Sequence, residues 1–431
     1  MPTPARQLCV LLHEDHVLTD AERRVPSYDG DQRHMPLQER AATCGDPDAV
    51  LISPQLQVHE DPMVLLSVFA SRGDRVVGTW TRIGDLAEDP EVVSALRSVA
   101  AVTGGSAPPP PRRSDWFRLD WYDEVEAWVD ARLGEQGRRR TGPVEPVSNW
   151  WISVVTRVPC DPGPPVWFKA ACPHFHAEPA LTRLVAEMDP EHAPRLVAVD
   201  EDRAWLLAEE MAGADEDREI PAGLGSAAAR VTATLQLRSL DHLAEIEAAG
   251  VPVRDLRTTS QQFEAVLDGS VELDQLSADE LAAARASRSK VRAVLTELAG
   301  LGIPDTLVHG DLHVGNVAHD GDALVLYDWS DAAVSHPFLD LIRLSERLPE
   351  DEQDRARAAF ADVWRAAFPD ADVDRALELA VSANTIYQVV TFEQIYRAGE
   401  DASYWEMRGI VARFLRELPG HLPRPVVEEA R

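Results

Sequence analysis

Short apolar runs, partly alternating with polar residues, occupy the first hundred residues of the chain. The runs at residues 8–12, 64–70 and 75–83 have the length and composition of β-strands, and residues 90–102 have the spacing of a helix. This mixture predicts a small α+β domain over residues 1–103. The sequence of that domain does not indicate what it does.

A segment rich in glycine and proline follows this first domain. Glycines and four consecutive prolines occupy residues 104–111, a composition that forms neither a helix nor a central strand. We therefore predict a semi-rigid linker over residues 104–114. Beyond the linker, Trp121, Val125 and Trp128 recur at helical spacing, which predicts a helix whose aromatic stripe lies in a core.

Residues 144–211 predict the element order strand, strand, helix, strand, strand. Two β-branched and aromatic runs, at 150–158 and 166–171, flank a turn of glycine and prolines and are typical of a hairpin. After residue 225 the apolar spacing is helical, except at residues 305–326, where short apolar runs surround polar residues. The segments with helical spacing are 227–249, 278–300, 351–368, 374–398 and 404–418.

The charge of the chain limits the classes of partner that it can bind. Its 431 residues include 73 acidic and 42 basic side chains, a formal net charge of −31. Such acidity argues against nucleic acid or an acidic membrane surface, because both would be repelled. It is compatible with a cationic small substrate, although acidity by itself can simply aid solubility.

The cysteines and the apolar runs predict a cytoplasmic protein. The four cysteines include no C-x-x-C pair, so neither a disulfide framework nor a thiolate zinc site is expected. No apolar stretch approaches the length of a membrane span, and the run at residues 8–12 is too short for a secretion signal.

The polar residues of the exceptional segment suggest a chemistry. Asp311 lies in a tight loop after a short apolar run, Asn316 follows five residues later, and a second run delivers Asp328. One carboxylate can accept the proton of an incoming hydroxyl, while an amide oxygen and a second carboxylate hold Mg²⁺ on a nucleoside triphosphate. Taken alone, Asp311 could simply form a turn in the loop, and Asp328 could simply cap a helix or a turn. The three residues together favour phosphoryl transfer to a hydroxyl.

The pattern H-G-D-L-H-x-G-N, followed by Y-D-W, resembles the aminoglycoside phosphotransferase and related small-molecule kinase superfamily. The resemblance covers roughly residues 144–418. It implies an α+β, bilobal, protein-kinase-like fold behind the small α+β N-terminal domain. The small antiparallel-sheet N-lobe with its leading helix would take residues 115–211, and the mostly helical C-lobe with the catalytic loop and acceptor site would take residues 212–431.

This resemblance also implies roles for single residues. Asp311 would be the catalytic base, and Asn316 and Asp328 would be the Mg²⁺ ligands of an ATP- or GTP-dependent enzyme. His309 and Gly310 would shape the loop. Asp340 would match a structural aspartate of the family, and His313 is expected to be a loop histidine rather than a phosphate ligand.

The upstream half offers a phosphate-binding lysine. Lys169 is one of only two lysines in the chain, and it lies within an apolar run that predicts a strand. A lysine is a compact point charge suited to the α- and β-phosphates, although an edge strand can also carry one without such a role. By resemblance its partner would be Glu178, with Glu187 as the second choice, and backbone groups from Glu209 to Met211 would bind the purine.

Motifs that the sequence lacks argue against two other classes of nucleotide-binding enzyme. No G-x-G-x-x-G precedes Lys169, which leaves the loop that covers the phosphates unassigned. The chain also lacks H-R-D and D-F-G, which disfavours a protein kinase, and it lacks the G-x-x-x-x-G-K-[ST] of P-loop NTPases.

The acceptor is expected to be a small molecule with a hydroxyl group that binds to the helical lobe. An acidic lobe favours an amino sugar or an aminoglycoside, while neutral sugars, choline-like amino alcohols and macrolides stay open. A non-catalytic pseudokinase, or binding module, is the alternative of another class. The candidate acceptor residues are Asp331, Glu346, Glu393 and Glu400 for cations, with Tyr387, Gln388, Tyr396 and Trp405 for stacking or hydrogen bonds.

Overall fold

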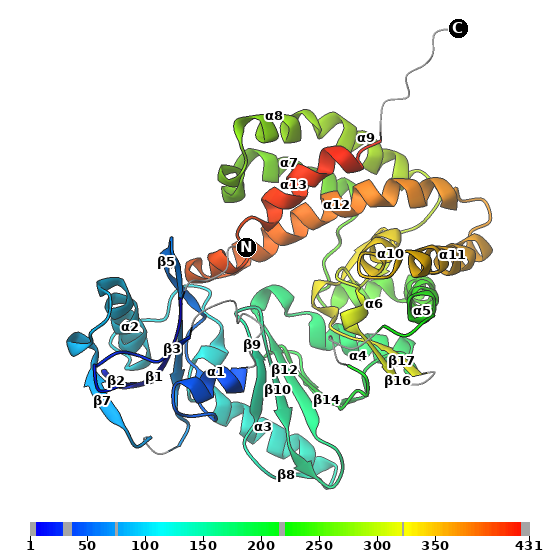
Figure 1. The fold of residues 1–431 in the computed structure, drawn as a ribbon. Coiled ribbons are helices and arrows are strands. Elements are labelled where there is room, and N and C mark those ends of the chain that lie inside the picture. The colour runs from blue at the N-terminus through cyan, green and yellow to red at the C-terminus, as the bar shows by residue number, and fades with distance from the viewer. Residues whose placement is uncertain (1–5, 29–36, 74–75, 215–219, 321–322, 424–431) are drawn as a thin grey trace. The chain divides into compact units, whose positions relative to one another are not determined.

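The computed structural model describes residues 6–28, 37–73, 76–214, 220–320 and 323–423 (Figure 1). The chain folds into two compact units, each built from separate stretches of sequence. The first unit comprises Met1–His174, Trp205–Glu210 and Arg397–Met407, and the second comprises Phe175–Ala204, Met211–Tyr396 and Arg408–Arg431.

The first unit begins with a mixed sheet in the order β4-β6-β1-β2-β7. Its central strands β1 (Arg6–His13) and β6 (Met63–Ala70) run parallel and are almost wholly buried, which explains their continuous apolar sequences. Both strands fall on predicted runs. The remaining elements are β2 (His16–Thr19), β3 (Ser27–Tyr28), α1 (Leu37–Thr43), β4 (Val50–Leu51), β5 (Leu56–Glu60), β7 (Thr79–Arg82), η1 (Ile83–Asp85) and α2 (Pro90–Thr103).

Helix α2 confirms the helix predicted at residues 90–102. Asp89 caps its N-terminus by accepting a hydrogen bond from the backbone N–H of Glu91 at 3.1 Å, and Pro90 occupies the first turn. The third predicted strand is shorter than expected at both ends: β7 begins only at Thr79, after a bend at residues 77–78, and the chain leaves it for a 3₁₀ turn at Ile83. Residue 75 of that run lies outside the described residues.

A second sheet of the first unit has the strand order β14-β12-β10-β9, and neighbouring strands in it are antiparallel. The predicted helix after the linker is α3 (Trp121–Glu135), which follows the short turn η2 (Asp115–Phe117). Its Trp121 packs edge-to-face on Phe168 and Trp205, so the aromatic stripe lies in a core as predicted. The strands are β8 (Arg139–Arg140), β9 (Glu145–Asn149), β10 (Ser153–Val158), β11 (Cys160–Asp161), β12 (Val166–Ala171) and β14 (Trp205–Glu209).

The second unit is mostly helical, and helices α5 and α11 pack along one another in it (Figure 1). Its described helices and longer 3₁₀ turns are α4 (Glu178–Met188), α5 (Leu224–Ser239), η4 (Leu240–His242), α6 (Leu243–Ala248), α7 (Leu256–Gly269), η5 (Val271–Gln275), α8 (Ala278–Ala286), α9 (Arg288–Ala299), α10 (Phe338–Ser345), α11 (Glu350–Ala367), α12 (Val373–Ala398) and α13 (Ile410–His421). Its strands are β13 (Leu196–Asp200), β15 (Thr306–Val308), β16 (Val317–Asp320), β17 (Ala323–Leu326) and β18 (Ala333–Ser335).

Three of the predicted helices differ from the observed ones. The segment 278–300 is divided at Ser287 into α8 and α9. The segment 227–249 is interrupted by the 3₁₀ turn Leu240–His242 between α5 and α6. The last predicted helix begins only at Ile410, because Gly409 has a φ of +88°, which breaks the helical path, and residues 401–406 form a separate 3₁₀ turn, η8 (Asp401–Glu406).

No helix within the described ranges is long and apolar enough to cross a lipid bilayer. The four cysteines are all free thiols, as their spacing predicted.

Candidate active site

Two strand pairs of the second unit frame the predicted catalytic loop. Strand β15 pairs with β18, and β16 pairs with β17, so the polar loop at residues 309–313 and the segment after β17 are both held at strand ends. Buried Asp340, in the first turn of α10, accepts hydrogen bonds from the backbone N–H groups of His309 and Gly310 at 2.9 and 3.0 Å. Asp340 therefore anchors the loop that leads into Asp311.

Gly310 is required by the backbone at this loop. Its φ is +82°, and a Cβ atom at this position would lie 2.1 Å from the carbonyl oxygen of Asp331. A side chain would therefore meet rigid backbone as well as an unfavourable conformation. The glycine allows the loop that carries Asp311 to approach the segment that carries Asp331.

His309 ties that loop to the segment of Asp328. Its Nε2 atom is 2.9 Å from the carbonyl oxygen of Tyr327, and its ring lies 4.6 Å from the ring of Trp329. The backbone N–H of Tyr327 in turn donates to the carbonyl oxygen of Asn316 at 3.1 Å. The segments carrying Asp311, Asn316 and Asp328 are thus joined by hydrogen bonds.

Asn316 and Asp328 present oxygen atoms that suit Mg²⁺. The side-chain amide nitrogen of Asn316 donates to the carbonyl oxygen of Asp311 at 2.9 Å, so the amide oxygen is the atom that can face a cation. Asp328 has a φ of +67°, and its Oδ1 accepts a hydrogen bond from Ser330 Oγ at 2.7 Å. A carboxylate and an amide oxygen are hard ligands, so the donor set fits the metal that the resemblance implies.

His313 lies beside Asp311 as a neutral ring. Its Nε2 is 3.7 Å from Asp311 Oδ2, and its Nδ1 accepts a hydrogen bond from the backbone N–H of Gly315 at 3.0 Å. Burial lowers the pKa of His313 to about 4, against the opposing effect of the Asp311 charge. Because Nδ1 accepts a hydrogen bond, the neutral ring carries its proton on Nε2, the nitrogen nearer to Asp311.

A side chain that sequence reasoning missed contacts Asp311 directly. Arg343 of α10 donates to Asp311 Oδ1 from both Nε and Nη2. The sequence could have indicated Arg343 by its position. It follows Asp340 by one helical turn and therefore lies on the face of α10 that holds the loop.

The predicted nucleotide-binding residues fall in both units. Lys169 lies in β12 opposite Val155 of β10 and Leu206 of β14, as the predicted strand required. Buried Glu178 opens helix α4 of the second unit, and Met211 begins the stretch after β14, so the pairing of Lys169 with Glu178 stays a prediction.

Two other carboxylates near these elements have partners of their own. Glu209, at the end of β14, pairs with Arg138 at 2.8 Å, and Glu187 of α4 pairs with Arg183 at 2.9 Å. The Glu209 side chain therefore has a structural partner, which leaves its backbone as the group predicted to bind a purine.

Several predicted acceptor residues serve the fold. Buried Glu393 of α12 accepts a hydrogen bond from Ser270 Oγ, buried Glu400 pairs with Arg113, and Trp405 Nε1 donates to the carbonyl oxygen of Gln55 at 2.9 Å. Of the five remaining candidates, Glu346 pairs with Arg343, and Gln388 donates to the carbonyl oxygen of Gly310. Tyr387 and Tyr396 are buried residues of α12, the former under the guanidinium of Arg254. Asp331 ends the 3₁₀ turn η7 (Trp329–Asp331).

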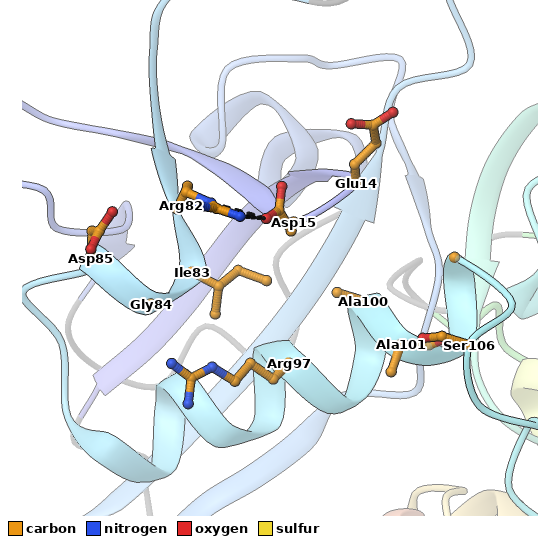
Figure 2. A pocket seen from close by; sticks show the side chains of 11 residues that line it. Glu14, Asp15, Arg82, Ile83, Gly84, Asp85, Arg97, Ala100, Ala101 and Ser106 are labelled. Atoms are coloured by element: carbon orange, nitrogen blue, oxygen red, sulfur yellow. Dashed lines mark hydrogen bonds and ion pairs between the residues drawn. The ribbon is translucent and has the colours of Figure 1, made fainter.

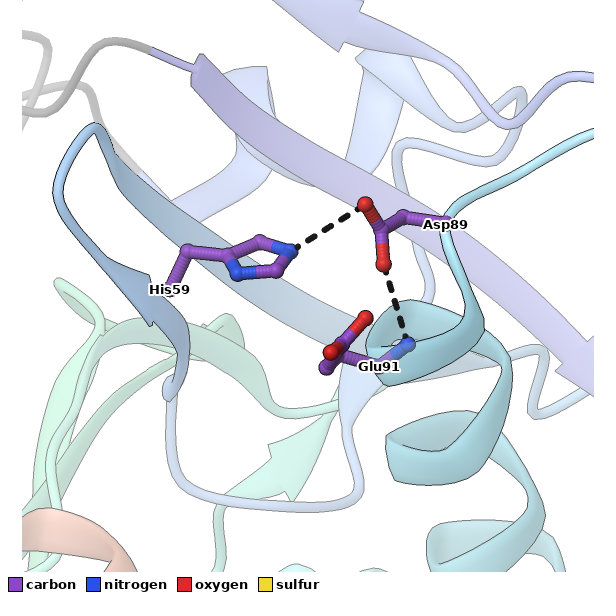
Figure 3. Close-up of side chains that lie close together, drawn as sticks. All are labelled: His59, Asp89 and Glu91. Atoms are coloured by element: carbon purple, nitrogen blue, oxygen red, sulfur yellow. Dashed lines mark hydrogen bonds and ion pairs between the residues drawn. The ribbon is translucent and has the colours of Figure 1, made fainter.

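The N-terminal half of the first unit carries two further polar features. A cavity of about 750 Å³ lies between β7, η1 and α2, with Arg82 bound to Asp15 at its edge and Arg97 inside it (Figure 2). At the N-terminus of α2, His59 lies 3.4 Å from Asp89 beside Glu91 (Figure 3). Asp89 and Glu91 are exposed, and Asp89 already caps α2.

Buried His336, two residues before the start of α10, is predicted to make the stability of the fold sensitive to acid. Burial lowers the pKa of His336 to about 3, so the folded state keeps the ring neutral where the unfolded chain binds a proton. The contribution of His336 to the free energy of unfolding is therefore fully present above about pH 6.5. It is lost as the pH drops from there toward 3, by about 1.4 kcal/mol per pH unit. Urea unfolding from about pH 7.5 to about pH 4.5 should show a shallower pH dependence in His336→Leu. Equal slopes in the two proteins would contradict this origin.

Comparison with known protein families places this chain in one of them. The chain belongs to the phosphotransferase enzyme family, whose model matches residues 153–379. The fold is accordingly the mixed α+β arrangement expected, with a β-sheet lobe and a helical C-terminal region. No curated protein matches the chain.

Solved structures with a similar fold share little sequence with this chain. A macrolide 2'-phosphotransferase type I is 15% identical, with a TM-score of 0.46 over 66% of this chain and 96% of the other. The GDP and kanamycin complex of APH(2")-IIia is 16% identical, with a TM-score of 0.49 over 69% and 99%. A choline/ethanolamine kinase family protein from Mesorhizobium loti is 16% identical, with a TM-score of 0.49 over 70% and 95%.

Proposed function

We propose that this phosphotransferase moves the γ-phosphoryl group of a Mg²⁺-bound nucleoside triphosphate, ATP or GTP, to a hydroxyl of a small molecule. The observation that carries the proposal is the hydrogen-bonded frame around Asp311. Asn316 binds the backbone of Asp311 at 2.9 Å, and His309 binds the segment of Asp328 at 2.9 Å. A base and two metal-ligating oxygens on one frame are what phosphoryl transfer requires.

In this proposal Asp311 orients the acceptor hydroxyl and takes its proton. The acceptor oxygen then forms a bond to the γ-phosphorus while the bond to the β-phosphate oxygen breaks, which leaves a nucleoside diphosphate. Asn316 and Asp328 would hold Mg²⁺, which supplies neutralisation of the phosphate charge when bound. Lys169 would contact the α- and β-phosphates with Glu178 as its partner, and the backbone at Glu209 and Met211 would bind the purine.

For the acceptor we propose an amino sugar or aminoglycoside, supported by the net charge of −31. A neutral hydroxyl compound is the second candidate, because Glu346, Glu393 and Glu400 have partners within the protein. Asp331 is the candidate whose backbone lies against the loop, because a Cβ atom at Gly310 would meet its carbonyl oxygen. Glu393 and Trp405 are the predicted acceptor contacts that the fold uses elsewhere.

An acceptor screen tests the proposal. Release of nucleoside diphosphate would be followed with ATP and with GTP over aminoglycosides, amino sugars, neutral sugars, amino alcohols and macrolides. We expect acceptor-stimulated release that disappears when EDTA removes Mg²⁺. A folded protein that binds no Mg²⁺-nucleotide would contradict the proposal. Nucleotide binding without turnover on any acceptor class would favour the pseudokinase alternative.

A further inference from the structure

Asp311 is held from the side by an arginine of α10. Both Nε, at 3.2 Å, and Nη2 of Arg343 point to the same oxygen, Oδ1 of Asp311. The Arg343 side chain is 14% exposed and that of Asp311 is 36% exposed. The guanidinium therefore occupies Oδ1. The other oxygen, Oδ2, lies 3.7 Å from His313 Nε2 and is the carboxylate oxygen without a contact to Arg343 among these bonds.

The other end of the guanidinium is fixed as well. Nη1 of Arg343 donates to Glu346 Oε2, and Glu346 Oε1 lies 3.4 Å from the side-chain amide nitrogen of Asn384 in α12. A planar guanidinium that is bound at both ends cannot rotate without breaking an ion pair. Four side chains thus connect α12, through α10, to the carboxylate in the loop.

We propose that Arg343 is a positioning residue for Asp311. It binds Oδ1, keeps the carboxylate in one orientation and directs Oδ2 toward the acceptor hydroxyl. This inference rests on the proposed function, because it assigns a role relative to the base of that reaction. Since orientation acts on the reacting geometry, loss of Arg343 should lower kcat and leave the KM values for nucleotide and acceptor nearly unchanged.

The opposite role for the same contact has a different signature. If Arg343 only blocked Asp311, its removal would expose the carboxylate and raise kcat. If Arg343 only stabilised the fold, its loss would lower the folded fraction, and the turnover per folded molecule would stay constant. The direction of the change in kcat per folded protein therefore separates the three roles.

The experiment uses the full chain with Mg²⁺-nucleotide and either the best acceptor of the screen or water alone. Arg343→Gln should lower kcat by about 100-fold, with both KM values within about threefold of wild type. Arg343→Ala should regain part of its kcat when free guanidinium ion is added at concentrations that do not unfold the protein. The double variant Arg343→Gln, Glu346→Gln keeps the local charge balanced and should match Arg343→Gln.

Arg375→Gln is the matched control. Arg375 also binds two carboxylates, those of Glu297 and Glu378. It lies in the first turn of α12, and neither of these ion pairs involves the loop that carries Asp311. An Arg343→Gln protein with unchanged or increased kcat, or a kcat loss that guanidinium does not restore, would overturn the positioning role alone. An inactive wild type would overturn the proposed function and this inference with it.

Discussion

Asp328→Asn is expected to lower kcat/KM for the Mg²⁺-nucleotide by about 1,000-fold, which corresponds to about 4 kcal/mol of transition-state stabilisation. The substitution removes one charge from the oxygens proposed to hold the metal. It spares the backbone, because Asp328 has a φ of +67° and asparagine is the residue that best tolerates this region after glycine. Steady-state kinetics over a range of Mg²⁺ concentrations measures the effect.

The readout that isolates the metal is nucleotide affinity with and without Mg²⁺. Wild type should bind the nucleotide more tightly with Mg²⁺ than with EDTA, and Asp328→Asn should bind it equally in both. Asp320→Asn, an exposed carboxylate at the end of β16, serves as the control and should behave as wild type. An Asp328→Asn protein that keeps the full Mg²⁺ dependence would remove Asp328 from the proposed metal site.

The part of the site that could be predicted is the part that local sequence encodes. His309, Gly310 and Asp311 are neighbours, and the backbone they adopt depends on a glycine at φ +82° and on Asp340, which lies about thirty residues later at the end of the same motif. Strand pairs on both sides bring Asn316 and the segment of Asp328 to the same loop. A motif that spans about thirty residues therefore contains most of its own geometry.

The acceptor residues could not be predicted in the same way, because their partners are distant in the sequence. Glu393 binds Ser270 across 123 positions, and Glu400 pairs with Arg113 across 287 positions. Periodicity indicates which face of a helix is apolar, yet it does not indicate that a buried carboxylate has a partner on another element. Arg343 was missed for another reason: its partner Asp311 lies only 32 residues earlier, but the motif assigns no role to the residue one helical turn after Asp340.

Helix ends were predicted less well than helices. Residues 240–242 continue an apolar spacing that looks helical, yet they form the 3₁₀ turn η4. The start of α13 depends on the left-handed backbone of Gly409, which places the first helical residue several positions after the predicted one. Both differences come from backbone conformation, which the spacing of apolar side chains does not report.

Asp311→Asn is expected to lower kcat by about 100- to 10,000-fold, the range for loss of a general base. The amide keeps an oxygen that can accept from Arg343, so its orientation is preserved while its basicity is lost. Arg343 also retains Glu346 as a partner, so the change should leave the folded state intact. Kinetics with the best acceptor, together with a urea unfolding curve for each protein, measures both expectations.

Asp311→Asn and Asp328→Asn should differ in how nucleotide binding responds to Mg²⁺. That difference distinguishes the loss of a base from the loss of a metal ligand. Asp311→Asn should bind the nucleotide with the Mg²⁺ dependence of wild type, because Asn316 contacts the backbone oxygen of residue 311 rather than its side chain. Asp328→Asn should lose that dependence. If Asp311→Asn also lost its response to Mg²⁺, Asp311 would act on the metal rather than on the acceptor hydroxyl. If it kept wild-type turnover, Asp311 would not be the group that accepts the proton of the acceptor hydroxyl.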